Sequence, residues 1–154
     1  LSAVQELDNF RIDEGKSIEK DFNDRIGNIS KALESIKSHD ASRVQHIKER
    51  IKKGLEDSVA KDKIDNNRFE QELIYYIEKL DINEEKVRLQ THIDYFLKTM
   101  QEPVAGRKLN FIGQEIGREV NTIGSKANDA EMQKLVVHMK DELEKIKEQT
   151  NNVL

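Results

Sequence analysis

The sequence predicts an all-α protein, built as a long helical hairpin followed by a helical bundle, with helix faces suited to coiled-coil contacts between subunits. Charged residues make up 36% of the 154 residues and proline occurs once, which is typical of long solvated helices. Apolar residues recur at intervals of three and four, the spacing of one helix face. No segment has a pattern that requires a β-strand.

Two helices are predicted before residue 56. In residues 14–38 one apolar stripe approaches a heptad repeat, formed by Ile18, Phe22, Ile26, Ile29, Leu33 and Ile36. Asp40 and Ser42 can cap a second helix, whose stripe consists of Val44, Ile47, Ile51 and Leu55. We therefore expect an antiparallel hairpin that turns near His39. Both stripes are narrow, so each helix needs a partner helix or a second subunit.

Polar residues between Asp57 and Asn67 predict a division into a hairpin, residues 1–66, and a C-terminal helical domain, residues 67–154. Four helices are predicted after this division: residues 68–80, residues 83 to about 102 with Asn83 as cap, residues 107–123, and a last helix that starts at Asn128 with Glu131 completing a capping box. Gly113 and Gly117 lie inside the third of these helices. Each costs roughly 1 kcal/mol relative to alanine, so we expect a close neighbour on that face.

Composition excludes several classes of protein. Without cysteine there is no disulfide framework, thiolate metal site or cysteine nucleophile. No apolar run approaches the roughly 18 residues of a membrane span, which is consistent with a cytoplasmic protein. The net charge of −4 gives no general attraction to nucleic acid, so any such binding is local. Residues 107–126 carry four basic and two acidic side chains and are net positive within the acidic chain.

The densest polar cluster lies in and after that region. Glu115 and Glu119 are four residues apart, so both carboxylates leave one helix face and could hold a divalent cation between them. The alternative is a surface ion network with Arg118, the commoner arrangement on an arbitrary helix. His92 is similarly open between a metal ligand or proton-transfer group and an interior hydrogen-bonded residue. From the residues alone the chain is a helical interaction module.

Residues 107–130 closely resemble the C-terminal signature of the YicC/YloC-like family of bacterial proteins, including many polar positions that helix formation does not demand. Residues 81–85, with Val87, Arg88, Leu89 and His92, resemble the acidic and Arg-Leu-x-x-His segment of the family, and residues 135–137 and 144–149 resemble its closing helix. The resemblance is strong from Asp81 onward and weak from Ile36 to Asn66. Family members carry a further segment before this region, and the chain begins at Leu1, so we expect it to be a fragment.

The resemblance implies an endoribonuclease that depends on a divalent metal cation, manganese or magnesium, forms ring-shaped homo-oligomers and acts in stress physiology. Under it, His92, Glu115 and Glu119 become the expected metal ligands, and these three with Arg118 the expected catalytic residues. The expected RNA contacts are Arg88, Arg107, Lys108, Asn121, Thr122, Ser125 and Lys126. The alternative is a non-catalytic helical oligomerisation or RNA-adaptor module. Whether this fragment is active alone stays open.

Overall fold

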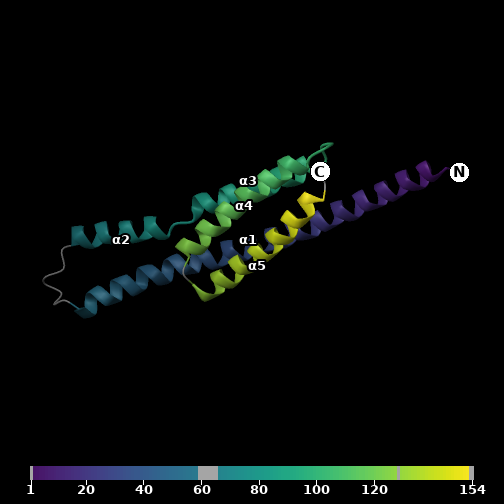
Figure 1. The fold of residues 1–154 in the computed structure, drawn as a ribbon. Helices are drawn as coiled ribbons and strands as arrows, with labels where there is room; N and C mark the ends of the chain where they lie inside the picture. Colours follow the sequence, from purple (N-terminus) through teal and green to yellow (C-terminus); the bar gives the residue numbers. More distant parts are fainter. Residues whose placement is uncertain (1, 59–65, 128, 153–154) are drawn as a thin grey trace.

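The computed structural model describes residues 2–58, 66–127 and 129–152, and within these ranges the chain is helical without any strand. Its helices are α1 (Ala3–Ser58), α2 (Asn66–Leu80), α3 (Asn83–Thr99), α4 (Gly106–Lys126) and α5 (Ala130–Asn151). Figure 1 shows α3, α4 and α5 gathered against the middle of the much longer α1, with α2 beside its far end. The all-α prediction is confirmed.

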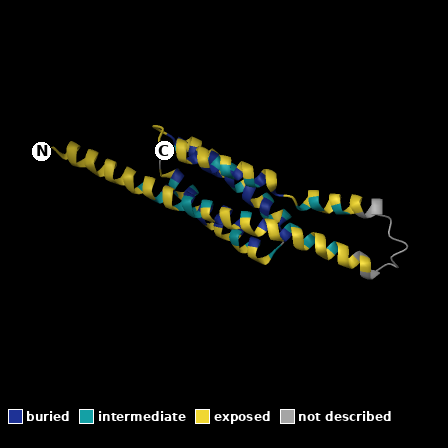
Figure 2. Cartoon of the chain, turned by 180° about the vertical axis from the view of Figure 1, so that it is seen from behind, coloured by how far each residue is buried: buried dark blue, intermediate teal, exposed yellow. Residues whose placement is uncertain are grey.

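The core lies where α1, α3, α4 and α5 meet. The heptad stripe of α1 supplies Phe22, Ile26 and Ile29, which are almost fully buried, and the Phe22 ring meets that of Phe96 edge to face, with centroids 5.5 Å apart. Burying a side chain of this size contributes about 1.5–3 kcal/mol. In Figure 2 the buried residues are concentrated in this central part, so the bundle is held mainly by the middle of α1.

The helix boundary predicted near His39 is wrong, because α1 continues through it to Ser58. Asp40 does not cap a helix. Its side chain is buried, with Arg43 Nη2 2.8 Å from Oδ1 and Lys86 Nζ of α3 2.7 Å from Oδ2, so both carboxylate oxygens are engaged within a continuous helix. The antiparallel neighbour of the outer half of α1 is α2. The division between residues 66 and 67 stays a prediction, since residues 59–65 lie outside the described ranges.

The remaining helices follow the predicted order closely. α3 ends at Thr99, ahead of Pro103 as expected, and the loop that follows holds Val104 with φ of 54°. The start of α5 differs from the prediction. Asp129 is the N-cap residue, and its carboxylate accepts from the backbone N–H groups of Glu131 and Met132, whereas Asn128 lies outside the described residues.

The expected close neighbour of the α4 glycines is α5. A Cβ added to Gly117 would lie 3.0 Å from Leu143 Cδ2, and one added to Gly124 would lie 3.0 Å from Val136 Cγ1. At Gly113 the nearest contact, also with Leu143, is 3.9 Å. The glycines therefore let α5 approach α4 closely, and the prediction is confirmed.

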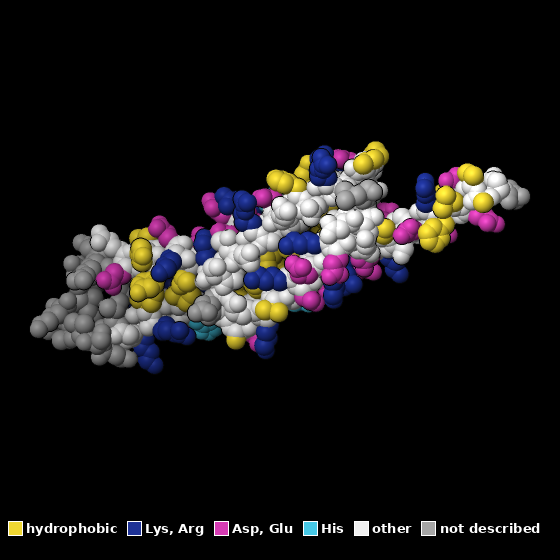
Figure 3. Space-filling view, viewed as in Figure 1, with side chains coloured by type: hydrophobic (Ala, Val, Ile, Leu, Met, Phe, Trp, Pro, Cys, Tyr) yellow, Lys and Arg dark blue, Asp and Glu magenta, His cyan; other side chains and the backbone are white. Residues whose placement is uncertain are grey.

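Both ends of the molecule leave apolar side chains in solvent. Residues 2–17 of α1 are all exposed, and this part of the helix projects from the bundle (Figure 1). Large exposed apolar residues occur there and on α2 (Figure 3): Val4, Leu7, Phe10, Ile12, Ile74, Tyr75 and Tyr76. Within the described ranges, none of the helices combines the length and apolar content that a membrane crossing requires.

Candidate active site between α3 and α4

The candidate site lies along the seam between α3 and α4, which pack side by side in opposite directions. Ion pairs tie the two helices together near both ends of this seam. Lys126 Nζ lies 2.8 Å from Glu85 Oε1 and donates to the backbone carbonyl of Asp81. At the other end, Lys108 Nζ of α4 lies 3.1 Å from Glu102 Oε2 in the loop after α3.

His92 and Glu119 meet between these ends. The His92 Nε2 to Glu119 Oε1 distance is 4.0 Å, an ion pair when the imidazole is protonated. His92 follows Glu85 by seven residues and Glu119 precedes Lys126 by seven, so both pairs use the same edge of each helix. The Glu119 side chain is 8% exposed and that of His92 is 24% exposed. The imidazole therefore faces solvent beside a carboxylate that is largely withdrawn from it.

Glu115 and Arg118 form a separate pair on the outer side of α4. Glu115 Oε1 lies 3.6 Å from Arg118 Nη2, and the Arg118 side chain is 73% exposed. Glu115 and Arg118 therefore form a surface ion pair, which was the alternative to a cation site. Glu115 and Glu119, expected to share a cation, have different partners in the structure.

The fit of the predicted metal can be tested on these side chains. Among the residues described, no group of three or more histidine, aspartate or glutamate side chains lies close enough to hold a metal ion. Magnesium requires near-octahedral coordination by oxygen, and of the three expected ligands the structure brings together His92 and Glu119. A metal requirement stays a prediction, and no reaction step is derived through one.

The predicted RNA-contacting cations are mostly held by carboxylates. Arg88 Nη2 lies 3.4 Å from Glu84 Oε2, and Lys126 is paired with Glu85. The hydrogen bond and charge of Glu102 raise the pKa of Lys108, with a smaller effect of Tyr95. Phosphate would have to compete with these carboxylates.

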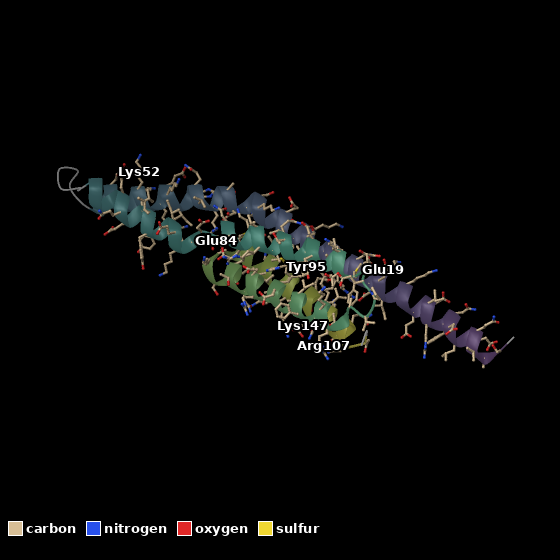
Figure 4. All side chains as sticks on the ribbon, turned by 90° about the horizontal axis from the view of Figure 1, so that it is seen from above. Glu19, Lys52, Glu84, Tyr95, Arg107 and Lys147 are labelled. Carbon is tan, nitrogen blue, oxygen red and sulfur yellow. The ribbon has the colours of Figure 1, made fainter. Side chains whose placement is uncertain are left out.

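The other predicted RNA contacts lie on the outer side of α4. Thr122 and Ser125 donate their hydroxyl hydrogens to backbone carbonyls one turn earlier, those of Arg118 and Asn121. Arg107 and Asn121 are exposed, and Figure 4 shows Arg107 at the start of α4 and Tyr95 on α3. Both hydroxyl groups can still accept a hydrogen bond from a ligand.

Sequence reasoning missed the role of Glu85. Its side chain is buried, and Oε2 has no hydrogen-bond partner although Oε1 holds Lys126. The seven-residue spacing to His92 was visible in the sequence and places both on one edge of α3. The identity of the partner was not visible, because it depends on how α4 is rotated against α3.

Comparison with known proteins shows the family of the chain. The model of the C-terminal region of YicC-like endoribonucleases matches residues 36–154. The chain belongs to the YicC-like family. Two relatives support this, both named as probable YicC endoribonucleases. The protein from Clostridioides difficile strain 630 is 38% identical over 156 aligned positions, covering 98% of this chain and 52% of the relative. The Haemophilus influenzae protein is 32% identical over 141 positions, covering 91% and 48%.

The chain spans about half the length of these curated YicC relatives. The region matched by the family model contains α2, α3, α4, α5 and the outer part of α1. The His92–Glu119 pair therefore lies within the YicC-like C-terminal region.

Proposed function

We propose that the protein to which this chain belongs is an endoribonuclease and that the seam between α3 and α4 takes part in cleaving RNA. The observation that carries the proposal is the meeting of His92 and Glu119, 4.0 Å apart, from two different helices. The names of the relatives, which describe probable endoribonucleases, indicate the substrate class.

The chemistry follows from what phosphodiester cleavage requires. A proton must leave the attacking oxygen and another must reach the leaving oxygen, and imidazole performs both tasks near neutral pH. Glu119, largely buried, orients the His92 ring, as a carboxylate does for histidine in hydrolase triads. The exposed guanidinium of Arg118 offsets negative charge that develops on the phosphate oxygens.

Substrate binding is assigned to the outer surface around this pair. We assign phosphate contacts to the predicted cations and polar side chains: Arg88, Arg107, Lys108, Asn121, Thr122, Ser125 and Lys126. Such contacts fix the position of a nucleic acid without reading its sequence. Each cation that neutralises a phosphate releases counterions from the RNA, so binding should weaken as salt rises.

The test of this proposal is the cleavage of a labelled RNA by the full-length protein. His92→Ala and Glu119→Gln should each reduce the rate about 100-fold or more, the contribution of a positioned acid or base. His138→Ala is the matched control, since His138 is an exposed histidine on α5. If His92→Ala and Glu119→Gln both cleave at the wild-type rate, with far-ultraviolet circular dichroism unchanged, the pair has no catalytic role.

The predicted requirement for manganese or magnesium is tested separately. Cleavage is measured after EDTA treatment and again after each metal is restored, in the wild type and in the double variant Glu115→Gln/Glu119→Gln. Loss with EDTA and recovery with metal only in the wild type would support carboxylate ligands for the cation. Full activity in EDTA would overturn the metal prediction and leave the His92 proposal standing.

A second candidate is a non-catalytic oligomerisation or RNA-adaptor module. The exposed apolar side chains at both ends of the molecule favour it, in particular Phe10 on α1 and Tyr75 on α2, since such residues mark contact surfaces when they cluster. A pure full-length protein that binds RNA, assembles into a ring in light scattering and leaves RNA intact with and without metal would support this alternative. Ring assembly and a link to stress both remain part of the proposal.

A further inference from the structure

Two exposed aromatic side chains lie on the helices that carry His92 and Glu119. Phe22 and Phe96 pack against each other in the core. Tyr95 of α3 is 43% exposed and Phe111 of α4 is 62% exposed, so neither ring is buried in the core of the bundle. Single exposed apolar residues are common, and it is the position of these two that calls for an explanation.

Both rings lie within one helical turn of residues assigned to the reaction. Tyr95 follows His92 by three residues, which places it on the neighbouring position along α3. Phe111 precedes Glu115 by four residues and follows Lys108 by three, so it belongs to the same outward strip of α4.

Tyr95 of α3 and Lys108 of α4 interact across the seam between the two helices. The tyrosine contributes, after Glu102, to the raised pKa of the lysine. Tyr95 therefore has a cation nearby, and Phe111 follows the same lysine by three residues on α4.

We propose that Tyr95 and Phe111 form a stacking platform for unpaired bases of RNA, so that the outer surface of α3 and α4 takes single-stranded segments. Proteins that bind single strands combine cations that follow the backbone with aromatic rings on which bases stack. In a duplex the base faces are already stacked on one another, and exposed rings on a helix surface cannot reach them. The inference rests on the proposed function and adds the class of RNA.

The arrangement also indicates which bond would be cut. A base stacked on Tyr95 brings its own phosphate near His92, one turn away on α3. Cleavage should therefore fall in unpaired segments, beside a base held by the platform, and duplex regions of the same RNA should resist it.

Binding of a fluorescein-labelled RNA of about 12 nucleotides, a length typical of single-strand grooves, tests the platform. In the full-length protein, Tyr95→Ala and Phe111→Ala should each weaken binding of the unpaired RNA by about 5-fold or more, and binding of a duplex of the same length should not change. Tyr75→Ala is the control, because Tyr75 on α2 is 62% exposed. Tyr95→Phe should retain the wild-type affinity.

A tryptophan reporter separates stacking from a general loss of structure. The chain contains no tryptophan, so Phe111→Trp introduces a single probe within it. Its fluorescence should be quenched by unpaired RNA and much less by duplex, and Tyr75→Trp should not respond.

Three outcomes would overturn the proposal. The first is unquenched Phe111→Trp fluorescence with RNA affinities unchanged in both alanine variants. The second is tighter binding of duplex than of single strand by the wild type. The third is a lower oligomer mass of the alanine variants in light scattering, with RNA binding lost only in proportion, which would identify the two rings as a contact between subunits. Continued cleavage that depends on His92 would in each case leave the proposed function intact.

Discussion

Asp40 joins three parts of the chain through one buried carboxylate. It pairs with Arg43 and Lys86, and Arg43 also donates to the backbone carbonyl of Leu80, just before α3. Removing one member of a buried ion pair leaves its partners as unpaired charges. Asp40→Ala should therefore lower the free energy of unfolding by about 3 kcal/mol, measured by urea denaturation.

Glu34 supplies the matched control for Asp40. It pairs with Lys37 at 2.9 Å on the same helix, with a side chain that is 65% exposed. Exposed pairs of this kind contribute about 0–1 kcal/mol. Equal urea midpoints for Asp40→Ala and Glu34→Ala would show that the buried network does not stabilise the fold.

Val104 holds a backbone conformation that suits glycine. Its φ is 54°, which costs an L-residue about 1–2 kcal/mol, and its side chain is 93% exposed, so packing gains little in return. Val104→Gly should raise the stability by up to about 1 kcal/mol, because the strain relief exceeds the extra entropy of an unfolded glycine. Val137→Gly, at an exposed position of helix α5, should have the opposite effect. A lower melting temperature for Val104→Gly would contradict this reading.

The candidate site shows what residue spacing within a helix can predict about side-chain positions and what it cannot. The four-residue spacing of Glu115 and Glu119 correctly placed both carboxylates on one side of α4. At about 100° per residue, however, they differ by about 40° around the helix axis. This difference lets Glu119 face His92 while Glu115 turns outward to Arg118. The rotation of α4 is fixed by its packing on α3 and α5, which spacing within one helix does not contain.

At the scale of helices, the close contact between α4 and α5 depends on glycines of α4, which carry no side chain. Gly27→Ala on α1 should stabilise the protein by about 1 kcal/mol through helix propensity, because nothing lies within 4 Å of the added Cβ. Gly124→Ala should lose this gain, since its Cβ would meet the stiff, β-branched Val136 at 3.0 Å. Thermal denaturation followed by circular dichroism measures the difference. An equal rise in melting temperature for both variants would contradict the close approach of the two helices.

Helix existence was predictable along most of the chain and one helix boundary was not. The apolar stripes predicted α2, α3 and α4 to within about three residues of their observed ends, because Pro103 and Gly106 mark the turn between α3 and α4 locally. The cap predicted at Asn83 is wrong, since Ile82 holds the N-cap position of α3 without a side-chain hydrogen bond. Asp40 and Ser42 resemble a cap in the sequence. The decisive fact is that Lys86, far along the chain, neutralises Asp40 inside the bundle. A long-range ion pair of this kind leaves no trace in the local pattern.

At the scale of the whole molecule, the same helix passes from solvent into the core. Phe22→Ala should cost about 3–5 kcal/mol, because this ring is 2% exposed and packed on Phe96. Phe10→Ala should change stability by less than about 0.5 kcal/mol, because Phe10 is 64% exposed. Urea denaturation of both variants checks this. A large loss of stability for Phe10→Ala, dependent on protein concentration, would instead show that the projecting part of α1 is covered by another subunit.

The continuity of α1 has a mechanical consequence. A helix of 56 residues is about 84 Å long at 1.5 Å per residue. Its middle packs against α3 and α5 and its outer half lies beside α2, whereas residues 2–17 are all exposed. If α1 tilts as one rigid rod within the bundle, its N-terminal arm and the end beside α2 must move in opposite directions.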